Sequence, residues 1–386
     1  MTVNKAVVSG ISTGLAQRSG TTVLFLHHGQ PRTPFYARQH LTKLWDHYHV
    51  PKFAKQSVTD AFWYSSKLLR KSVADISNYK TIDETVSTYV AQLEVALNSL
   101  TPEFEPVSCR AAYLFDSPSI EARVQEIIRQ GTDSLMLVSL YPFDIPQLTH
   151  PMFSTANSVI GKMTRSMEGL NADQNYRIAI NSPVSFNLLQ LSNLGSHMSI
   201  VQYWSERIKS NLDAFDSVVF AVPLPLQNRK KYISMIDETT KRIMYVLYES
   251  YPRAVPWRTA IMYVLYESYP RAVPWRTAFY SPWNQFWPPI STHTVENRIK
   301  DLRSLGRSRT LVVPIGEFFQ NFDTQTILPS IISGKENVQL LVPESVDQAL
   351  VNSFAEIVKT SLLQRVAEQQ KIPRVKTEAT AAEALV

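Results

Sequence analysis

The sequence predicts an α/β fold with parallel sheets, arranged in two similar halves. Apolar runs of about five or six residues, the length of a buried strand, alternate along the chain with amphipathic helical patterns. Strands that alternate with helices in this way form βαβ units, and these connections require parallel strands. One helix–glycine–strand unit occurs in each half, before LMLVSLYP and before LVVPIGEF. We therefore expect the two halves to resemble each other.

The strands are expected where the apolar runs lie: Thr22–His27, Ala111–Phe115, Leu135–Leu140, Val218–Val222, Leu311–Ile315 and Val338–Val342. In the first half, Ser117 is expected to cap a helix with Pro118 in its first turn, and Gly131 to end it. In the second half Gly306 is expected to end the matching helix, whose apolar stripe is Val295, Ile299, Leu302 and Leu305.

The boundary between the halves is predicted near residue 180, which gives lobes at 21–180 and 181–365. Residues 1–20 contain no Asp or Glu, which fits either an organellar presequence or a frayed terminus. Residues 366–386 are predicted to be a polar, mobile tail.

An 18-residue segment, Ile243–Ala260, is repeated letter for letter as Ile261–Ala278. Repeat proteins diverge and need three or more repeats, so we expect one of the two copies to be structurally surplus.

Composition excludes several classes of protein. The chain has 386 residues, of which 44% are hydrophobic and 19% charged, so a full core is expected rather than disorder. The net charge of +6 comes from scattered residues, which argues against nucleic-acid binding. A single cysteine, Cys109, excludes a disulfide within the chain and a four-cysteine zinc or iron–sulfur site.

The strongest functional signal lies where two predicted strands end. Tyr141–Pro151 (YPFDIPQLTHP) closes one strand and Pro314–Thr326 (PIGEFFQNFDTQT) closes another. Ligands of open α/β sheets bind just past the carboxyl ends of the strands. Both segments are rich in the polar and aromatic residues that such a site needs.

Three segments, taken in order, resemble the ferrochelatase family, whose members insert ferrous iron into protoporphyrin. They are VLFLHHGQPRTP, the stretch from FDSPSIEAR to SLYP, and the stretch from TAFYSPWNQFWPP to GEFFQNFDT. The resemblance covers Thr21 to Leu363. It implies two Rossmann-like lobes with parallel sheets, of the ferrochelatase or type II chelatase kind, with a porphyrin cleft between them.

The resemblance also shows a loss. The family keeps its catalytic histidine in a Phe-Ser-x-His-x-x-Pro pattern, and this chain reads Phe220-Ala221-Val222-Pro223-Leu224-Pro225. Pro223 therefore stands where the histidine is expected. Proline can neither accept a proton nor bind a metal.

The second family pattern, Pro-Ile-x-Phe-x-x-Asp-His-x-Glu-Thr-Leu, is altered as well. Gln320 and Asn321 stand at the aspartate and the histidine, and Asp323 stands at the glutamate. Asp323 is either a surviving proton acceptor or a leftover loop carboxylate. His150 is either a substitute base or an exposed loop residue. The family's Gly-Gly-Ser-Pro loop reads Ser77-Asn78-Tyr79-Lys80 here.

By the same resemblance, the porphyrin-binding candidates are His27, His28, Tyr141, Phe143, Trp283 and Trp287. The two tryptophans could equally pack their proline-rich loop against the second lobe. Phe62, Trp63 and Tyr64 suit either peripheral membrane contact at a cleft lip or an ordinary helix with one core face.

The function implied is that of a ferrochelatase-like protein of haem metabolism. It would bind protoporphyrin or haem in the cleft as a pseudoenzyme, with iron insertion lost or reduced. The alternatives are an active ferrochelatase of haem biosynthesis and a non-catalytic interaction partner. The resemblance further implies a homodimer on the matrix side of the mitochondrial inner membrane, with a cytoplasmic location as the alternative. No covalent cofactor is expected.

Overall fold

The computed structural model describes residues 20–31, 39–40, 42–43, 46, 79–101, 106–132, 134–173, 187–224, 229–250, 273–280, 293–344 and 346–371. Within these residues the strands form two four-stranded sheets. The first sheet has the order β2-β1-β3-β4 and consists of β1 (Thr21–His27), β2 (Ser108–Tyr113), β3 (Ser134–Ser139) and β4 (Asn187–Leu191). The second has the order β6-β5-β7-β8 and consists of β5 (Ser217–Pro223), β6 (Trp275–Tyr280), β7 (Thr310–Val313) and β8 (Val338–Leu340).

The two sheets have the same topology. In each sheet, the first strand along the chain is an inner strand. The second strand along the chain pairs with it and forms one edge of the sheet. All neighbouring strands are parallel. The predicted α/β fold with two similar parallel-sheet lobes is thus confirmed.

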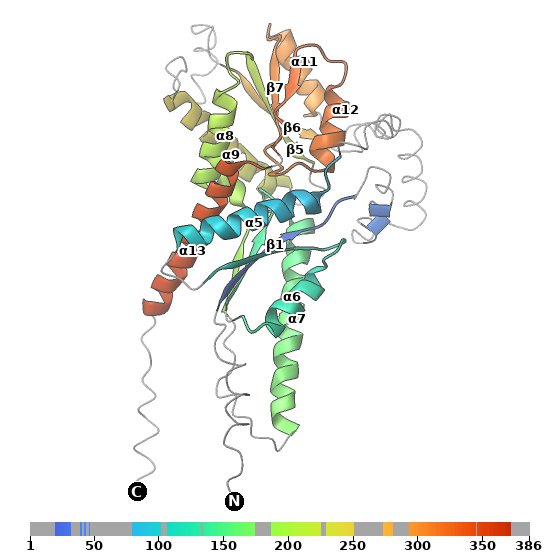
Figure 1. The fold of residues 1–386 in the computed structure, drawn as a ribbon. Helices are drawn as coiled ribbons and strands as arrows, with labels where there is room; N and C mark the ends of the chain where they lie inside the picture. The colour runs from blue at the N-terminus through green and yellow to red at the C-terminus, as the bar shows by residue number, and fades with distance from the viewer. Residues whose placement is uncertain are drawn as a thin grey trace, which may run out of the picture.

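Helices fill the connections between the strands. In the first lobe they are α5 (Ile82–Leu100), α6 (Ile120–Arg129) and α7 (Pro146–Asp173). In the second they are α8 (Met198–Lys209), α9 (Arg229–Ser250), α11 (Val295–Ser304) and the short α12 (Leu328–Ile332), with the 3₁₀ turn η3 (Leu194–Ser196) and the π-helical turn η5 (Asp323–Ile327). The last helix, α13 (Gln348–Lys371), contacts both α5 and α8. Figure 1 shows the two sheets one above the other, with α5 and α13 crossing between them.

The larger of the two hydrophobic clusters among the described residues runs through both lobes. Phe354 of α13 lies edge-on to Phe25 of β1, with 6.3 Å between ring centroids, and edge-on to Phe318 beyond β7 at 5.0 Å. Both contacts are buried. Since a single side chain of α13 packs on residues of both lobes, burial of apolar surface holds the lobes together.

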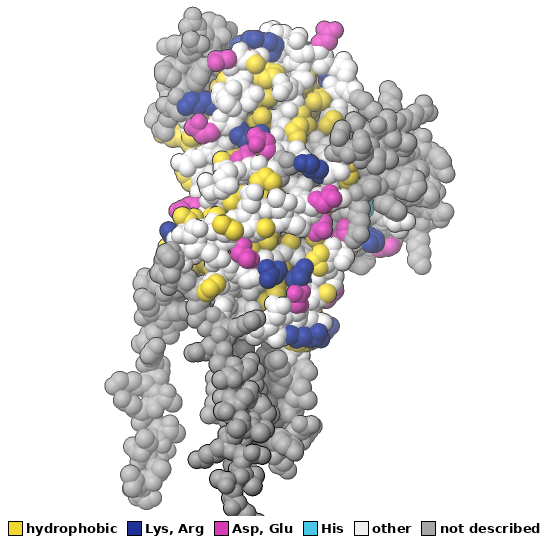
Figure 2. Space-filling model, viewed as in Figure 1, with side chains coloured by type: hydrophobic (Ala, Val, Ile, Leu, Met, Phe, Trp, Pro, Cys, Tyr) yellow, Lys and Arg dark blue, Asp and Glu magenta, His cyan; other side chains and the backbone are white. Residues whose placement is uncertain are grey.

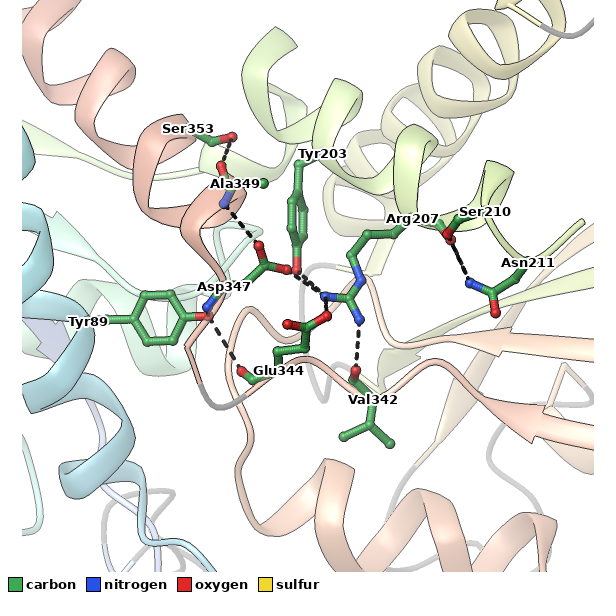
Figure 3. A network of polar contacts seen from close by, with 10 residues as sticks. All are labelled: Tyr89, Tyr203, Arg207, Ser210, Asn211, Val342, Glu344, Asp347, Ala349 and Ser353. Carbon is green, nitrogen blue, oxygen red and sulfur yellow. Dashed lines mark hydrogen bonds and ion pairs between the residues drawn. The ribbon is translucent and has the colours of Figure 1, made fainter.

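Polar contacts join the same elements (Figure 3). Arg207 of α8 lies 2.5 Å from Asp347 and 3.3 Å from Glu344, on the segment that leads into α13. The Asp347 N–H donates to the Tyr89 hydroxyl of α5 at 2.6 Å. The network therefore ties α5, α8 and the start of α13 to one another.

The predicted ends of α6 and α11 are confirmed, but the predicted start of α6 is wrong. Gly131 and Gly306 follow α6 and α11 with φ of 79° and 78°, the left-handed conformation that glycine adopts without strain. Ser119, not Ser117, caps α6, because its hydroxyl accepts the Ala122 N–H at 3.2 Å. Pro118 therefore precedes the helix instead of lying in its first turn.

Several strand bounds differ from the prediction. β2 begins at Ser108 rather than Ala111, and β7 ends at Val313 rather than Ile315. Pro314 has no N–H to continue the ladder, which explains the early end of β7. β4 and β6 were not predicted as strands.

The two copies of the duplicated segment contribute different elements. The first copy supplies Ile243–Ser250, the last residues of α9, and the second supplies Trp275–Ala278 of β6. The residues between, 251–272, lie outside the described part of the chain.

The surface in Figure 2 carries acidic and basic side chains side by side, with hydrophobic side chains scattered among them. In the described part of the chain, no helix combines the length and apolar character needed to cross a bilayer.

Candidate functional site

The candidate site lies where strands of both sheets end. His27 is the last residue of β1, Tyr141 follows β3, and Pro223 ends β5. The segment after β7 carries Glu317 and Asp323. Parallel strands present their carboxyl ends on one edge of a sheet, so these residues are brought to matching edges of the two lobes.

The first lobe contributes a stack of rings. Tyr141 lies 4.9 Å from His27 and 5.4 Å from His28 between ring centroids, with interplanar angles of 16° and 20°. The two imidazoles are 4.5 Å apart, and His40 lies 5.4 Å from His28. Three predicted porphyrin-binding residues are thus in contact with one another.

Burial keeps these imidazoles neutral. It lowers the pKa of His27 to about 3, with a further contribution from His40, and lowers the pKa of His28 well below its usual value. The pKa of His40 falls to about 4 for the same reason. Gly29 N–H donates to Nδ1 of His27 at 3.0 Å, so the proton of that neutral ring lies on Nε2.

Two polar atoms of the stack have no partner among the described residues: Nδ1 of His28 and the hydroxyl of Tyr141. Both side chains are at most 9% exposed. Buried polar atoms are nearly always hydrogen-bonded, and an exception needs an explanation. A bound ligand would supply one.

The second lobe contributes two carboxyl groups. Glu317 is buried, accepts the Tyr280 hydroxyl at 3.1 Å and accepts the Asn321 side-chain amide at 2.5 Å. Asp323 is half-buried at the start of the π-helical turn η5, a feature often found at functional sites. Burial raises the pKa of Asp323 to about 7 and, together with the charge of Asp323, raises the pKa of Glu317 well above its usual value.

The two halves of the site are joined by hydrogen bonds. The side-chain oxygen of Gln30, two residues beyond His28, accepts a hydrogen bond from the backbone N–H of Phe322, which precedes Asp323. Lys80 N–H donates to Gln325 Oε1 at 2.9 Å, and Gln325 donates back to the Lys80 carbonyl at 2.8 Å. Tyr79 donates to the Pro31 carbonyl at 2.8 Å, and burial raises its pKa, with a smaller contribution from the nearby charge of Asp323. The turn with Asp323 therefore faces the end of β1.

Pro223, the last residue of β5, is tightly packed. A Cβ added to Gly316 would lie 2.4 Å from Cδ of Pro223, so the proline ring rests against the glycine backbone. The Pro223 carbonyl accepts the Tyr232 hydroxyl at 3.2 Å. Glu317 directly follows Gly316 in the sequence, so it lies near Pro223 as well.

Two other predicted residues, His150 and Phe143, have no printed hydrogen bond or ion pair with Glu317 or Asp323 among the described residues. The His150 side chain is 67% exposed, and its Nε2 lies 3.9 Å from Asp144. Phe143 is buried and packs edge-on against Tyr232 at 6.0 Å. The role of His150 as a substitute base and that of Phe143 in binding stay predictions.

Several predictions fall on residues outside the described part of the chain: Phe62, Trp63, Tyr64, Trp283 and Trp287. Within the described part, no group of three or more His, Cys, Asp or Glu side chains is placed to hold a metal ion.

Glu317, Gln30 and His40 are site residues that sequence reasoning missed. Glu317 carried a usable signal, because it is a charged residue within a run of mainly apolar and aromatic residues, VVPIGEFF. A carboxyl group at a position expected to be buried and apolar is costly and often functional. Gln30 carried none, since its contact with Phe322 crosses 292 positions of the sequence.

Comparisons with known proteins do not assign the chain to a family. No protein-family model matches it, and no curated protein matches it. Among solved structures, it is similar to the sirohydrochlorin chelatase SirB from Bacillus subtilis subspecies spizizenii in complex with cobalt, with a TM-score of 0.41 and 12% identity over 89% of this chain and 95% of that one. SirB from Bacillus subtilis with Fe3+ gives the same values. An ABC transporter periplasmic solute binding protein from Actinobacillus succinogenes 130z with bound D-allose gives 0.34 and 8%, over 90% and 91%. Likenesses at such TM-scores do not establish a shared function.

Proposed function

We propose that the protein binds a tetrapyrrole of the porphyrin class between the two lobes, and that metal insertion there is lost or slow. The observation that carries the proposal is that two unlike groups of largely buried side chains meet at the strand ends. One is the stack of His27, His28 and Tyr141, and the other is the carboxyl pair of Glu317 and Asp323. The hydrogen bond from Phe322 to Gln30 keeps them close.

These two groups of side chains suit the chemistry of the ligand. A macrocycle is flat and apolar at its faces, so aromatic side chains favour its binding. Its centre carries N–H groups, which can donate hydrogen bonds to a carboxylate. The unpartnered hydroxyl of Tyr141 and Nδ1 of His28 add polar atoms for the ligand's edge.

Slow insertion follows from Pro223. Metal insertion requires a base that removes inner pyrrole protons. The proline supplies no such base, and its ring occupies the space against Gly316. A histidine there would have to displace that contact.

Porphyrin titration tests the proposal. Protoporphyrin IX, kept monomeric in a non-ionic detergent, should give a saturable Soret shift with a stoichiometry of one ligand per chain. Tyr141→Ala should weaken binding about tenfold, as expected when one stacking side chain is removed. Lys241→Ala, on the exposed side of α9, is the matched control. A titration that does not saturate would refute the proposal.

A second candidate, metal insertion with Asp323 as proton acceptor, is favoured by one observation. Burial raises the pKa of Asp323 to about 7, which is near the best value for a base at neutral pH. Turnover of protoporphyrin with ferrous iron would support this candidate, provided that Asp323→Asn abolishes it. Unchanged turnover in that variant would eliminate Asp323 as the acceptor.

On the resemblance alone, we also propose a mitochondrial location, peripheral membrane contact through Phe62, Trp63 and Tyr64, and a homodimer. Light scattering of the purified protein tests the dimer, and sedimentation with cardiolipin-containing vesicles tests the membrane contact. A protein that binds no porphyrin but co-purifies with a partner chain would instead support the interaction role.

A further inference from the structure

The ring stack of the candidate site is covered in this structure. The side chains of His27, His28 and Tyr141 are at most 9% exposed. A flat ligand as large as a macrocycle can contact these rings only after they have been uncovered. The contacts that hold the cover in place therefore bear on how a ligand enters.

Two glutamine side chains join the first lobe to the turn after β7. The side-chain oxygen of Gln30 accepts the N–H of Phe322. Gln325 reaches in the opposite direction: its Oε1 accepts the Lys80 N–H at 2.9 Å, and its Nε2 donates to the Lys80 carbonyl at 2.8 Å. We call these three hydrogen bonds the glutamine latch.

Each side of the glutamine latch is held together by hydrogen bonds of its own. In the first lobe, the Tyr79 hydroxyl donates to the Pro31 carbonyl at 2.8 Å, so the neighbours of both first-lobe latch residues are bonded to each other. In the second lobe, the Asn321 N–H donates to the Thr324 hydroxyl at 2.9 Å, and the Thr324 N–H donates to Oδ1 of Asn321 at 3.0 Å. Because both sides are internally fixed, the bonds of the latch should form and break together.

Other contacts between the lobes involve buried rings. Phe354 of α13 packs on rings of both lobes, and Phe143 after β3 packs edge-on against Tyr232 of α9 at 6.0 Å. Separating such rings exposes apolar surface to water, at a cost that grows with the area. The hydrogen bonds of the latch can instead be exchanged for bonds to water, so the net contribution of each is small. The edge of the lobes that carries the latch therefore opens at the lower cost.

We propose that the glutamine latch is a gate: the lobes separate at the latch, with the packing around α13 as the hinge, and a ligand enters the site in that open state. The inference rests on the proposed function, since the gated site is the one proposed for the tetrapyrrole. The turn after β7 keeps its own hydrogen bonds, and the movement lies between the lobes. The fraction of molecules with an open latch then sets the rate of ligand association.

Amide hydrogen exchange, followed by NMR, tests the gate without any ligand, because it reports the opening of individual hydrogen bonds. Gln30→Ala removes the acceptor of the Phe322 N–H and leaves the bonds of Gln325 in place. The Lys80 N–H should nevertheless exchange about threefold to tenfold faster, the factor expected when one hydrogen bond is lost. Gln325→Ala should have the same effect on the Phe322 N–H. If each variant affects only the N–H that it deprives of an acceptor, the bonds are independent and the gate is refuted.

Gln348→Ala is the matched control. Gln348 donates to Asn352 at 3.0 Å on the exposed side of α13, and its loss should change neither N–H of the latch. The Leu140 N–H, which donates to the Leu26 carbonyl at 2.9 Å within the first lobe, should exchange at the wild-type rate in every variant. If the buried change Gln30→Ala loosens the whole lobe, Gln325→Ala at its half-buried position gives the deciding result.

Stopped-flow measurement of protoporphyrin IX association tests whether the gate controls entry. With the porphyrin kept monomeric in a non-ionic detergent, Gln325→Ala should speed association about threefold to tenfold, because the open fraction rises by the same factor. Gln348→Ala should leave the association rate unchanged. Association that is unchanged or slower in Gln325→Ala would overturn the gate.

The outcomes distinguish the two proposals. Saturable porphyrin binding without coupled exchange at Phe322 and Lys80 would overturn the gate and leave tetrapyrrole binding intact. If protoporphyrin IX does not bind saturably, the proposed function fails whatever the exchange shows, and the role of the latch in admitting a tetrapyrrole fails with it.

Discussion

At the scale of residues, the raised pKa of Asp323 has a consequence for stability. The folded pKa of about 7 lies above the ordinary value of 3.8. The folded state therefore keeps a proton that the unfolded state releases. The stability that the Asp323 carboxyl group contributes is fully present below about pH 4 and is lost as the pH rises towards 7.

Asp323→Asn should remove this loss of stability at high pH, because asparagine does not ionise. We expect the variant to exceed the wild type in free energy of unfolding by about 1 to 2 kcal/mol at pH 8, after allowance for screening at a half-buried group. At pH 4.5 the difference should nearly vanish. Urea denaturation at both pH values measures it, with Asp237→Asn on the exposed side of α9 as a control that should change little. A variant no more stable than the wild type at pH 8 would contradict the raised pKa.

Which site residues could be predicted depended on where their partners lie. The resemblance named His27, His28 and Tyr141 as candidates, and the structure brings them into contact at the ends of β1 and β3. Glu317 was missed because its partners, Tyr280 and Asn321, come from an unpredicted strand and from the loop after β7. The sequence shows that a proline stands at position 223, but it does not show that Gly316 packs against the proline ring.

At the scale of elements, the contacts of α13 hold the lobes in their relative positions. Arg207 and Asp347 are only 16% and 11% exposed. Asp347 also accepts the Ala349 N–H in the first turn of α13 at 3.0 Å, so the ion pair and the helix start depend on each other. Figure 3 shows Tyr89 of α5 reaching the same residues.

Arg207→Ala should cost about 2 to 3 kcal/mol in the free energy of unfolding, because it leaves Asp347 partly buried without its cation. Lys241→Ala breaks an exposed pair on α9 and should cost less than about 0.5 kcal/mol. Chemical denaturation of both variants gives the comparison. Equal, small losses would mean that the network adds nothing to the joining of the lobes.

The elements that could be predicted are those with a strong local pattern. Fully buried strands such as β1, β5 and β7 are continuous apolar runs, which is typical of parallel sheets. β4 is a short sheet-edge strand with mixed sequence, NLLQL. β6, WRTAFY, begins within the duplicated segment. Their strand conformation is set by pairing with β3 and β5, which the local sequence does not reveal.

At the scale of the whole molecule, the duplicated segment lengthens one connection between α9 and β6. Helix α9 uses the start of the first copy and β6 uses the end of the second. Deleting residues 251–268 leaves a single copy and keeps every described residue of both elements. The remaining connection has a length usual for helix-to-strand loops.

The deletion variant should fold, bind protoporphyrin as the wild type does, and gain about 1 kcal/mol from the shorter loop. Replacing residues 251–268 by a Gly/Ser linker of equal length is the control, and it should leave stability near that of the wild type. Thermal and urea denaturation report both. Loss of folding in both variants would show that the additional copy is part of the structure.

The central claim concerns the whole molecule: a macrocycle lies between the strand ends of the two lobes. A crystal structure of the protein saturated with protoporphyrin IX tests it most directly. The account predicts planar density in contact with Tyr141 on one side and with Asp323 on the other. Density bound elsewhere on the surface, or none at saturating ligand, would contradict it.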